Sequence, residues 1–346
     1  MEKYLIYDFS EYGFAREPVI RRMPGGTLVC AFLTGGTAEP QNANVVMLSY
    51  SNDDGRTWTQ PRTAVSHSER GCWATEIFTQ TERPFIAVHT YNTNSYKREH
   101  YRELQTFRLA LDGNGQPVGE PVSFCGLNGV SVRQGFRMSD GEIFFPVYWQ
   151  EVLYDFDWAT DSTARHGGQQ RYPFRCGCAV SRDGVVFERF GYLDAPASVW
   201  EPTAVELEKG HIMMLMRSDA EAFLRRSDSF DFGRTWTKPA VTDIENAHTK
   251  PSLFKIGNTV FLVNNFVQAQ GLKNRTHLQI RATRDGVHWR PACKPEEDDA
   301  NFFYPHPCVS EETKTVYLAY EDGVKHFLVR IGFDELFADG GKNALG

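Results

Sequence analysis

The sequence predicts an all-β protein in which six four-stranded antiparallel blades form a closed β-propeller, and three observations support this prediction. A turn motif built around Asp and Gly recurs four times, and a second glycine-turn motif recurs between its copies. No stretch of the 346 residues shows convincing helical periodicity. Self-similarity along a chain is the signature of repeat architectures, and short strands joined by regular turns indicate an all-β one.

The first motif has a Ser or Thr, then an Asp, a Gly and a closing aromatic residue. The Asp side chain can accept hydrogen bonds from backbone amides of the turn, the Gly adopts a positive φ, and the aromatic ring packs beneath the loop. Two copies match over eight residues and two are one residue shorter; the four are 51–58, 181–187, 229–236 and 283–289. We expect these turns to be structural and to lie at the blade edge away from the functional site.

The second motif is a glycine turn that leads into a short apolar run, and its copies are 24–29, 140–146, 209–214 and 256–261. Together the two motifs divide the chain into six modules, each with room for the four strands of a propeller blade. The modules are 15–60, 70–122, 126–190, 200–240, 247–292 and 302–335. We expect residues 1–14 to pair with the last module and close the ring, which removes exposed sheet edges. Residues 1–346 would then form one domain, with 338–346 as a loose tail.

Composition narrows the class of function. A net charge of −7 gives no basic face for nucleic acid, and no apolar stretch is long enough to span a membrane. The seven cysteines contain no CxxC pair, and neither an EF-hand nor a zinc-binding spacing occurs, so we expect no cofactor and no metal. The N-terminus lacks the apolar run of a secretory signal, which indicates a cytoplasmic protein or a mature secreted form.

The Asp turns resemble the Asp boxes, or bacterial neuraminidase repeats, of the sialidase (neuraminidase) superfamily, and further motifs extend the resemblance over nearly the whole chain. Arg16-Glu17-Pro18, followed by the turn that ends at Thr27-Leu28, is similar to the opening motif of sialidases, with Glu17 in place of an Ile. Four further segments resemble the third-blade signature, the segment with the catalytic Glu and second Arg, the segment with the third Arg, and the segment with the nucleophilic Tyr. They are 134–146, 200–217, 275–280 and 303–321.

The resemblance implies a carboxylate clamp of Arg16, Arg217 and Arg275, with Tyr304 as nucleophile and Glu201 as its base. This set is chemically coherent because Arg offers planar, bidentate donors to a carboxylate. A phenol with a pKa near 10 is a poor nucleophile, but a neighbouring carboxylate can take its proton as the new bond forms. Sialidases are a known exception to the two-carboxylate pattern of glycosidases because their nucleophile is a Tyr.

The general acid departs from the family pattern. Sialidases carry an Asp on the loop before the first Asp box, and the corresponding position here is Pro40. Glu39 is the only acidic residue in the loop 35–44, and we expect it to serve as the acid. That role requires a protonated carboxyl at working pH, so burial or a like charge would have to raise its pKa.

The leading functional hypothesis is a sialidase-like retaining exo-glycoside hydrolase that releases a terminal sialic acid or a related acidic sugar. One alternative is a glycosidase or lyase acting on uronate-containing polysaccharides; another is a non-catalytic propeller that binds an acidic sugar or glycan. His89, Trp149 and His248 with Lys250 fall near predicted blade ends, where packing is the ordinary role of each single residue. His248 and Lys250 would nevertheless offer a cation and an acid or base if the chemistry differs from that of sialidases.

Overall fold

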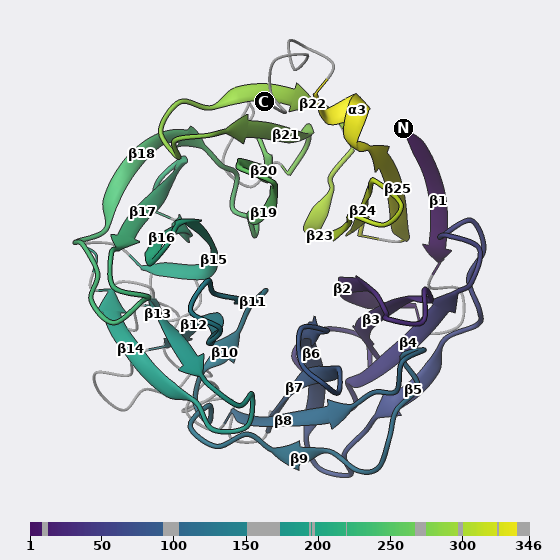
Figure 1. Ribbon diagram of the computed structural model, residues 1–346. Coiled ribbons are helices and arrows are strands. Elements are labelled where there is room, and N and C mark those ends of the chain that lie inside the picture. Colours follow the sequence, from purple (N-terminus) through teal and green to yellow (C-terminus); the bar gives the residue numbers. More distant parts are fainter. Residues whose placement is uncertain are drawn as a thin grey trace.

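The structure is a computed structural model of the chain, and it describes residues 1–8, 13–92, 104–150, 174–193, 195, 198–218, 220–266, 275–296, 300–323 and 325–337. Six antiparallel sheets stand around one central axis (Figure 1), which confirms the prediction of a six-bladed propeller. The tail predicted at 338–346 lies outside the described residues.

The blades follow one another along the chain, and in each the first strand lies nearest the axis (Figure 1). Blade 1 contains β2 (Ala15–Arg22), β3 (Leu28–Thr34), β4 (Val45–Ser51) and β5 (Arg62–Val65). Blade 2 contains β6 (Gly71–Phe78), β7 (Phe85–Tyr91), β8 (Gln105–Ala110) and β9 (Val122–Ser123). The innermost strand of blade 3 is split into β10 (Ser131–Val132) and β11 (Phe136–Arg137), followed by β12 (Ile143–Gln150), β13 (Phe174–Ser181) and β14 (Glu188–Leu193).

Blade 4 contains β15 (Val199–Glu208), β16 (His211–Ser218), β17 (Phe223–Ser229) and β18 (Ala240–Glu245). Blade 5 contains β19 (Ser252–Ile256), β20 (Thr259–Asn265), β21 (Leu278–Thr283) and β22 (Arg290–Cys293). Blade 6 contains β23 (Phe303–Ser310), β24 (Thr315–Glu321) and β25 (His326–Gly332), and a short helix, α3 (Phe333–Leu336), follows it. The second strands β3, β20 and β24 are buried along their whole length, because each blade is covered by a neighbour on both faces.

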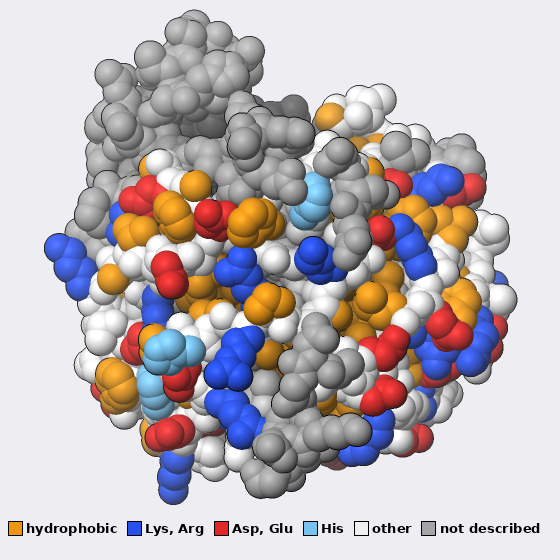
Figure 2. All heavy atoms as spheres, turned by 90° about the horizontal axis from the view of Figure 1, so that it is seen from above, with side chains coloured by type: hydrophobic (Ala, Val, Ile, Leu, Met, Phe, Trp, Pro, Cys, Tyr) orange, Lys and Arg blue, Asp and Glu red, His pale blue; other side chains and the backbone are white. Residues whose placement is uncertain are grey.

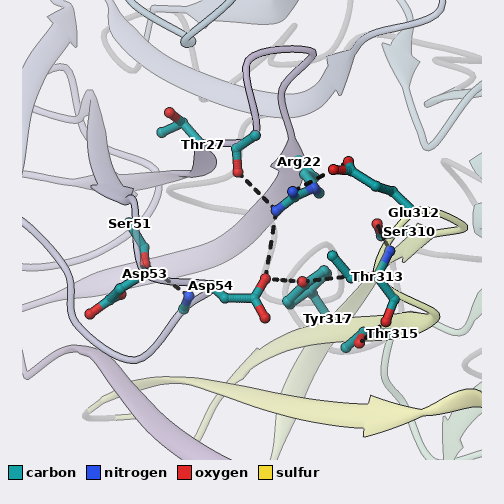
Figure 3. Close-up of polar contacts among 12 residues, drawn as sticks. Arg22, Thr27, Ser51, Asp53, Asp54, Ser310, Glu312, Thr313, Thr315 and Tyr317 are labelled. Carbon is teal, nitrogen blue, oxygen red and sulfur yellow. Dashed lines mark hydrogen bonds and ion pairs between the residues drawn. The ribbon is translucent and has the colours of Figure 1, made fainter.

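The ring closes through the N-terminal strand, as the sequence predicted. β1 (Glu2–Tyr7) pairs antiparallel with β25 and supplies the outer strand of blade 6. Asp54, in the first Asp box, links blades 1 and 6 at this seam: it accepts a hydrogen bond from Tyr317 and from Nη2 of Arg330 (2.6 Å), and Nη1 of Arg22 lies 3.6 Å away. Figure 3 shows Asp54 between Arg22 and Tyr317.

The Asp boxes join the third strand to the fourth in blades 1, 3, 4 and 5. In the third box, Oδ1 of Asp231 accepts hydrogen bonds from Ser229 and from the backbone amide of Thr235, at 2.9 and 2.8 Å. Gly233 takes a φ of 85°, and Trp236 donates to its carbonyl oxygen at 2.8 Å. Strand direction alternates within a blade, so these turns lie at the face opposite to the start of the innermost strands.

Charges are mixed on the part of the outer edge that Figure 2 shows. Figure 2 shows acidic and basic side chains interspersed over the described part of the edge near α3, with no single-sign patch there. Within the described residues, no helix is long and apolar enough to cross a membrane.

Candidate functional site

The residue before a proline takes an unusual conformation at the start of three innermost strands. Glu17, Glu201 and Tyr304 have φ values of 49°, 44° and 49°, and each precedes a proline. In β2, β15 and β23 the pairing register with the second strand shifts at this same point. A bulge of this kind re-aims a side chain, and bulges often occur next to active sites. The same local feature therefore recurs at one face of the ring in blades 1, 4 and 6.

Glu201 and Arg217 form a buried ion pair. Their residues lie on β15 and β16, and Nη1 of Arg217 donates to Oε2 of Glu201 at 2.8 Å. The guanidinium of Arg217 lies 4.0 Å from the ring centroid of Trp200, which pairs directly with it across the two strands. Both side chains of the ion pair are 4% exposed or less, so this contact fixes the orientation of the Glu201 carboxylate.

Arg16 is held at the same face by a carboxylate of blade 6. Its Nη1 donates to Oε1 of Glu321 at 3.0 Å, and Nε2 of His326 lies 3.2 Å from the other oxygen of Glu321. Burial keeps the pKa of His326 below its usual value, so the neutral ring donates this bond. The rings of Phe14 and Phe303 lie 5.5 Å from the Arg16 guanidinium, which leaves its remaining donors at the mouth of the site.

Arg275 lies beside the Tyr304 ring. Its guanidinium is 4.8 Å from the Phe303 centroid and 5.7 Å from the Tyr304 centroid. The backbone of Arg275 is fixed from two sides, because its amide donates to Asn301 at 2.9 Å and its carbonyl accepts from Asn265 at 2.8 Å. Burial and the Glu201 carboxylate raise the pKa of the Tyr304 phenol, and Arg275 opposes them. Tyr304 is therefore a neutral phenol at physiological pH.

Glu39 lies on the loop that joins β3 to β4, at the face where β2 begins. Asn44 secures this loop by donating to the carbonyl oxygen of Ala38 at 3.1 Å and accepting from Tyr91 at 2.6 Å. The Glu39 side chain is exposed to solvent, although many protein atoms surround and partly bury its carboxyl group. This burial, together with the charges of Glu17 and Glu321, raises the pKa of Glu39 to about 8.

All six residues singled out from the sequence therefore lie in one charged cluster. Tyr304 interacts electrostatically with Glu201, Arg275 and Glu39, and Arg16 interacts with Tyr304 and Glu39. Arg217 joins the cluster through its ion pair with Glu201. The structure thus brings together residues from blades 1, 4, 5 and 6 that are separated by up to 288 positions in the sequence, from Arg16 to Tyr304.

Two further members, Glu17 and Arg133, escaped the sequence reasoning. Nη1 of Arg133 donates to Oε2 of Glu17 at 2.8 Å, and Trp73 donates to the same oxygen at 3.2 Å. Arg133 also donates to the Tyr148 hydroxyl at 3.0 Å and lies 3.7 Å from a Glu201 oxygen. Burial raises the pKa of Glu17, but Arg133 and then Lys250 outweigh it, so the pKa of Glu17 lies below its usual value. Glu17 is therefore an ionised part of the cluster.

Lys250 is the third residue whose contribution the sequence left open. It precedes Pro251 at the start of β19, so it occupies in blade 5 the place that Glu17, Glu201 and Tyr304 occupy in theirs. Its ammonium nitrogen lies 5.8 Å from the Tyr304 ring centroid. The repeated residue-then-proline step was the sequence signal that could have identified both Lys250 and Glu17.

His89 is a structural residue, as expected of a single histidine near a blade end. It is fully buried, and its two ring nitrogens lie 2.9 and 3.0 Å from the hydroxyls of Thr75 and Thr106. The amide of Val132 donates to its Nε2 at 3.3 Å, and burial lowers the pKa of His89 to about 3. It is a neutral core group that ties blade 3 to blade 2.

A cavity of about 410 Å³ lies farther along the innermost strands, toward the opposite face. Its lining includes Arg21, Gln134, Val205, Leu253 and Pro307, and none of the six residues of the cluster. The charged cluster therefore lies at the other end of the axis from this cavity.

The fold and the axial cluster together define a propeller of the sialidase-like class. The model of the BNR repeat-like domain matches residues 117–318, more than half of the chain, and the chain belongs to this family. The resemblance to sialidases seen in the sequence is confirmed at the level of fold and family. No curated protein matches the chain in sequence.

Several solved structures share the fold. The Hadza microbial sialidase Hz136 is 18% identical, with a TM-score of 0.71 over 93% of this chain and 66% of that one. A Trypanosoma rangeli sialidase in complex with 2,3-difluorosialic acid is 18% identical, with a TM-score of 0.67 over 94% of this chain and 55% of that one. A protein of unknown function from Dyadobacter fermentans is 16% identical, with a TM-score of 0.70, covering 95% of this chain and 97% of that one. At these identities the likeness establishes the fold, and the chain spans only part of both sialidases.

Proposed function

We propose that this protein is a retaining exo-glycoside hydrolase that releases a terminal sialic acid or a related acidic sugar. The observation that carries the proposal is the placement of Tyr304 among Glu201, Glu39 and Arg275, at the face where Arg16 and Arg217 also lie. These groups supply a nucleophile, a base, an acid and an anion-binding region. The structure of the T. rangeli sialidase is described as a covalent intermediate, which is consistent with a nucleophilic mechanism on this fold.

In the first step, the Tyr304 oxygen attacks the anomeric carbon while its proton passes to Glu201. The glycosidic bond breaks, and the leaving oxygen takes the proton of Glu39. A neutral phenol suits this attack because the sugar carboxylate next to the anomeric carbon would repel an anionic nucleophile. The raised pKa of Tyr304 means that it stays neutral until it reacts, so transfer to Glu201 must accompany bond formation.

In the second step, a water molecule attacks the anomeric carbon and gives its proton to the Glu39 carboxylate. The bond to Tyr304 breaks, and the phenolate recovers its proton from Glu201. The configuration at the anomeric carbon is retained after two displacements. Glu39 is suited to this alternation because a pKa of about 8 lets it hold the proton at neutral pH and still release it.

A substrate panel tests the proposal. The purified protein is assayed on an aryl sialoside and on aryl glycosides of uronic acids, and Tyr304→Phe and Arg275→Met are assayed alongside. We expect turnover of the sialoside or of a closely related keto-acid glycoside, lost in Tyr304→Phe. Turnover of uronides alone would favour the alternative uronate-acting enzyme, and binding without turnover would favour the non-catalytic alternative.

A further inference from the structure

Lys250 is a buried cation without a hydrogen-bond partner in the described part of the protein. Its side chain belongs to a residue that is 5% exposed, and no carboxylate of the described residues lies within ion-pair distance of its ammonium group. The ammonium nitrogen is not among the described side-chain atoms that are fully enclosed without a partner, so it reaches solvent in the site, but it has lost most of its hydration without a hydrogen bond that would offset this loss. Such a group indicates a binding partner that the free chain does not supply.

The backbone that carries Lys250 is rigidly attached to both neighbouring blades. Ser252 donates to the carbonyl oxygen of Pro305 at 2.6 Å, directly after Tyr304. On the other side, the backbone amide of Leu253 donates a hydrogen bond at 2.8 Å to the hydroxyl of Thr203, which lies two residues after Glu201. The start of β19, which carries Lys250, is therefore attached on one side to the strand of Tyr304 and on the other to the strand of Glu201.

The charges of the cluster are unequally matched. Arg16, Arg133 and Arg217 each contact a glutamate oxygen at 2.8–3.0 Å. Arg275 and Lys250 have no such partner among the described residues, and both lie within 6 Å of the Tyr304 ring centroid, at 5.7 and 5.8 Å. Burial lowers the pKa of Lys250 to about 8, and Glu17 opposes it, so the ammonium is largely charged at neutral pH. The two cations that lack a carboxylate partner among the described residues, Arg275 and Lys250, therefore both lie beside the Tyr304 ring.

We propose that Lys250 acts with Arg275 to bind the acidic group of the ligand, as a fourth cation of the anion-binding site. The proposal rests on the proposed function in taking an acidic sugar as the ligand. The contact between the Lys250 ammonium and the ligand would make a negatively charged group on the ligand necessary for tight binding. It also assigns Lys250 a role in recognition, distinct from the proton transfers of Tyr304, Glu201 and Glu39.

The test compares a ligand with and without its negative charge. Isothermal titration calorimetry measures binding of the unsaturated sialic acid analogue DANA and of its methyl ester to the wild type, Lys250→Met and Lys250→Arg. Lys209→Met, which removes an exposed lysine at the opposite face, is the matched control. We expect Lys250→Met to weaken binding of the acid about 10–100-fold and to leave the ester within about twofold, since a hydrogen bond to a charged group has this value. Lys250→Arg should retain part of the affinity.

Thermal unfolding of the ligand-free variants supplies a readout that needs no sugar. Lys250→Met should lower the melting temperature by no more than about two degrees, because the ammonium makes no hydrogen bond that would be lost and only its longer-range attraction to Glu17 disappears. Inorganic sulfate, at ionic strength matched with chloride, should stabilise the wild type more than Lys250→Met. If DANA does not bind but the sulfate difference is present, the sugar class of the proposed function is wrong and the anion-binding role of Lys250 stands.

Three results would overturn the proposal. Equal weakening of acid and ester in Lys250→Met would place the contact elsewhere on the ligand. Unchanged binding of the acid, with a melting temperature several degrees lower, would make Lys250 a structural residue. If the wild type does not bind DANA, and if sulfate stabilises the wild type and Lys250→Met equally, the protein has no anion-binding site at Lys250.

Discussion

Replacement of Glu39 by Gln removes the proton that the proposed mechanism delivers to the leaving group, while it keeps the size of the side chain. The structure sets the magnitude through the pKa of about 8 in place of the ordinary 4.5. At pH 7 this shift raises the protonated fraction from roughly 0.3% to about 90%, so the acid is available about 300 times more often.

The assay uses two substrates that differ in the leaving group. An activated aryl glycoside hardly needs protonation, so Glu39→Gln should lower its kcat only modestly. A natural glycoside with a poor leaving group should lose about two to four orders of magnitude in kcat, the usual value of a positioned acid. Because the protonated form is the active one, kcat of the wild type on the poor leaving group should fall above pH 8, by about tenfold per pH unit. In Glu39→Gln this alkaline decline should disappear.

Lys250 also loses its charge near pH 8, so kcat at saturating substrate is the quantity to compare, because it separates the acid from the binding contact. Glu120→Gln, an exposed residue far from the cluster in sequence, controls for the change in net charge. Equal losses on the two substrates would assign Glu39 to binding or structure. An alkaline decline that persists in Glu39→Gln would show that another group is the acid.

Three further predictions test other parts of the molecule. Tyr304→Phe should lose at least about a thousand-fold in kcat and bind DANA within about fivefold of the wild type, because the arginines remain; near-normal turnover would exclude covalent catalysis by this residue. Arg133→Met leaves the buried Glu17 carboxylate with only the Trp73 hydrogen bond and the more distant charge of Lys250, and it should lower the free energy of unfolding by about 3–5 kcal/mol in denaturant titration; an unchanged midpoint of unfolding would mean that the ion pair does not stabilise the fold. Asp231→Ala removes the acceptor of the third Asp box and should cost about 1–3 kcal/mol of unfolding free energy with kcat unchanged; a loss of activity in the folded variant would contradict its structural role.

The fold could be predicted because its information is local and repeated. The hydrogen bonds and the positive-φ glycine of each Asp turn involve only residues within the turn. The four copies can therefore be recognised in the sequence, where they mark the connections between third and fourth strands, before the arrangement of the blades is known. The module limits followed from the same turns and agree with the blades to within a few residues at most boundaries. Closure by β1 was predictable because a propeller must remove its free edges.

The cluster was only partly predictable, since its contacts join blades rather than neighbours in the chain. Arg16, Glu201 and Tyr304 stand in motifs that can be matched by resemblance, and Glu39 is the sole acid of its loop. Glu17 and Arg133 are 116 positions apart in the sequence, and no local sequence pattern predicts an ion pair between residues so far apart along the chain. A glutamate in place of an isoleucine was nevertheless a physical signal, because a buried carboxylate needs a cation.

Lys250 illustrates the same limit. A lysine before a proline is an ordinary exposed residue in most sequences, and its burial becomes evident only when six innermost strands surround one axis. The recurrence of the residue-then-proline step in blades 1, 4, 5 and 6 was visible in the sequence. Its meaning depends on the bulges that direct three of these side chains, which only the paired strands reveal.

The central claim is that Tyr304 becomes covalently bonded to an acidic sugar. The most direct measurement incubates the protein with 2,3-difluorosialic acid and follows the intact mass, then locates the label by peptide mapping. The account predicts that the C2 fluoride leaves and that one 3-fluorosialosyl group is added per chain, on the peptide that contains Tyr304, with no label in Tyr304→Phe. A wild-type protein that stays unlabelled, or one labelled on a different residue, would contradict the account.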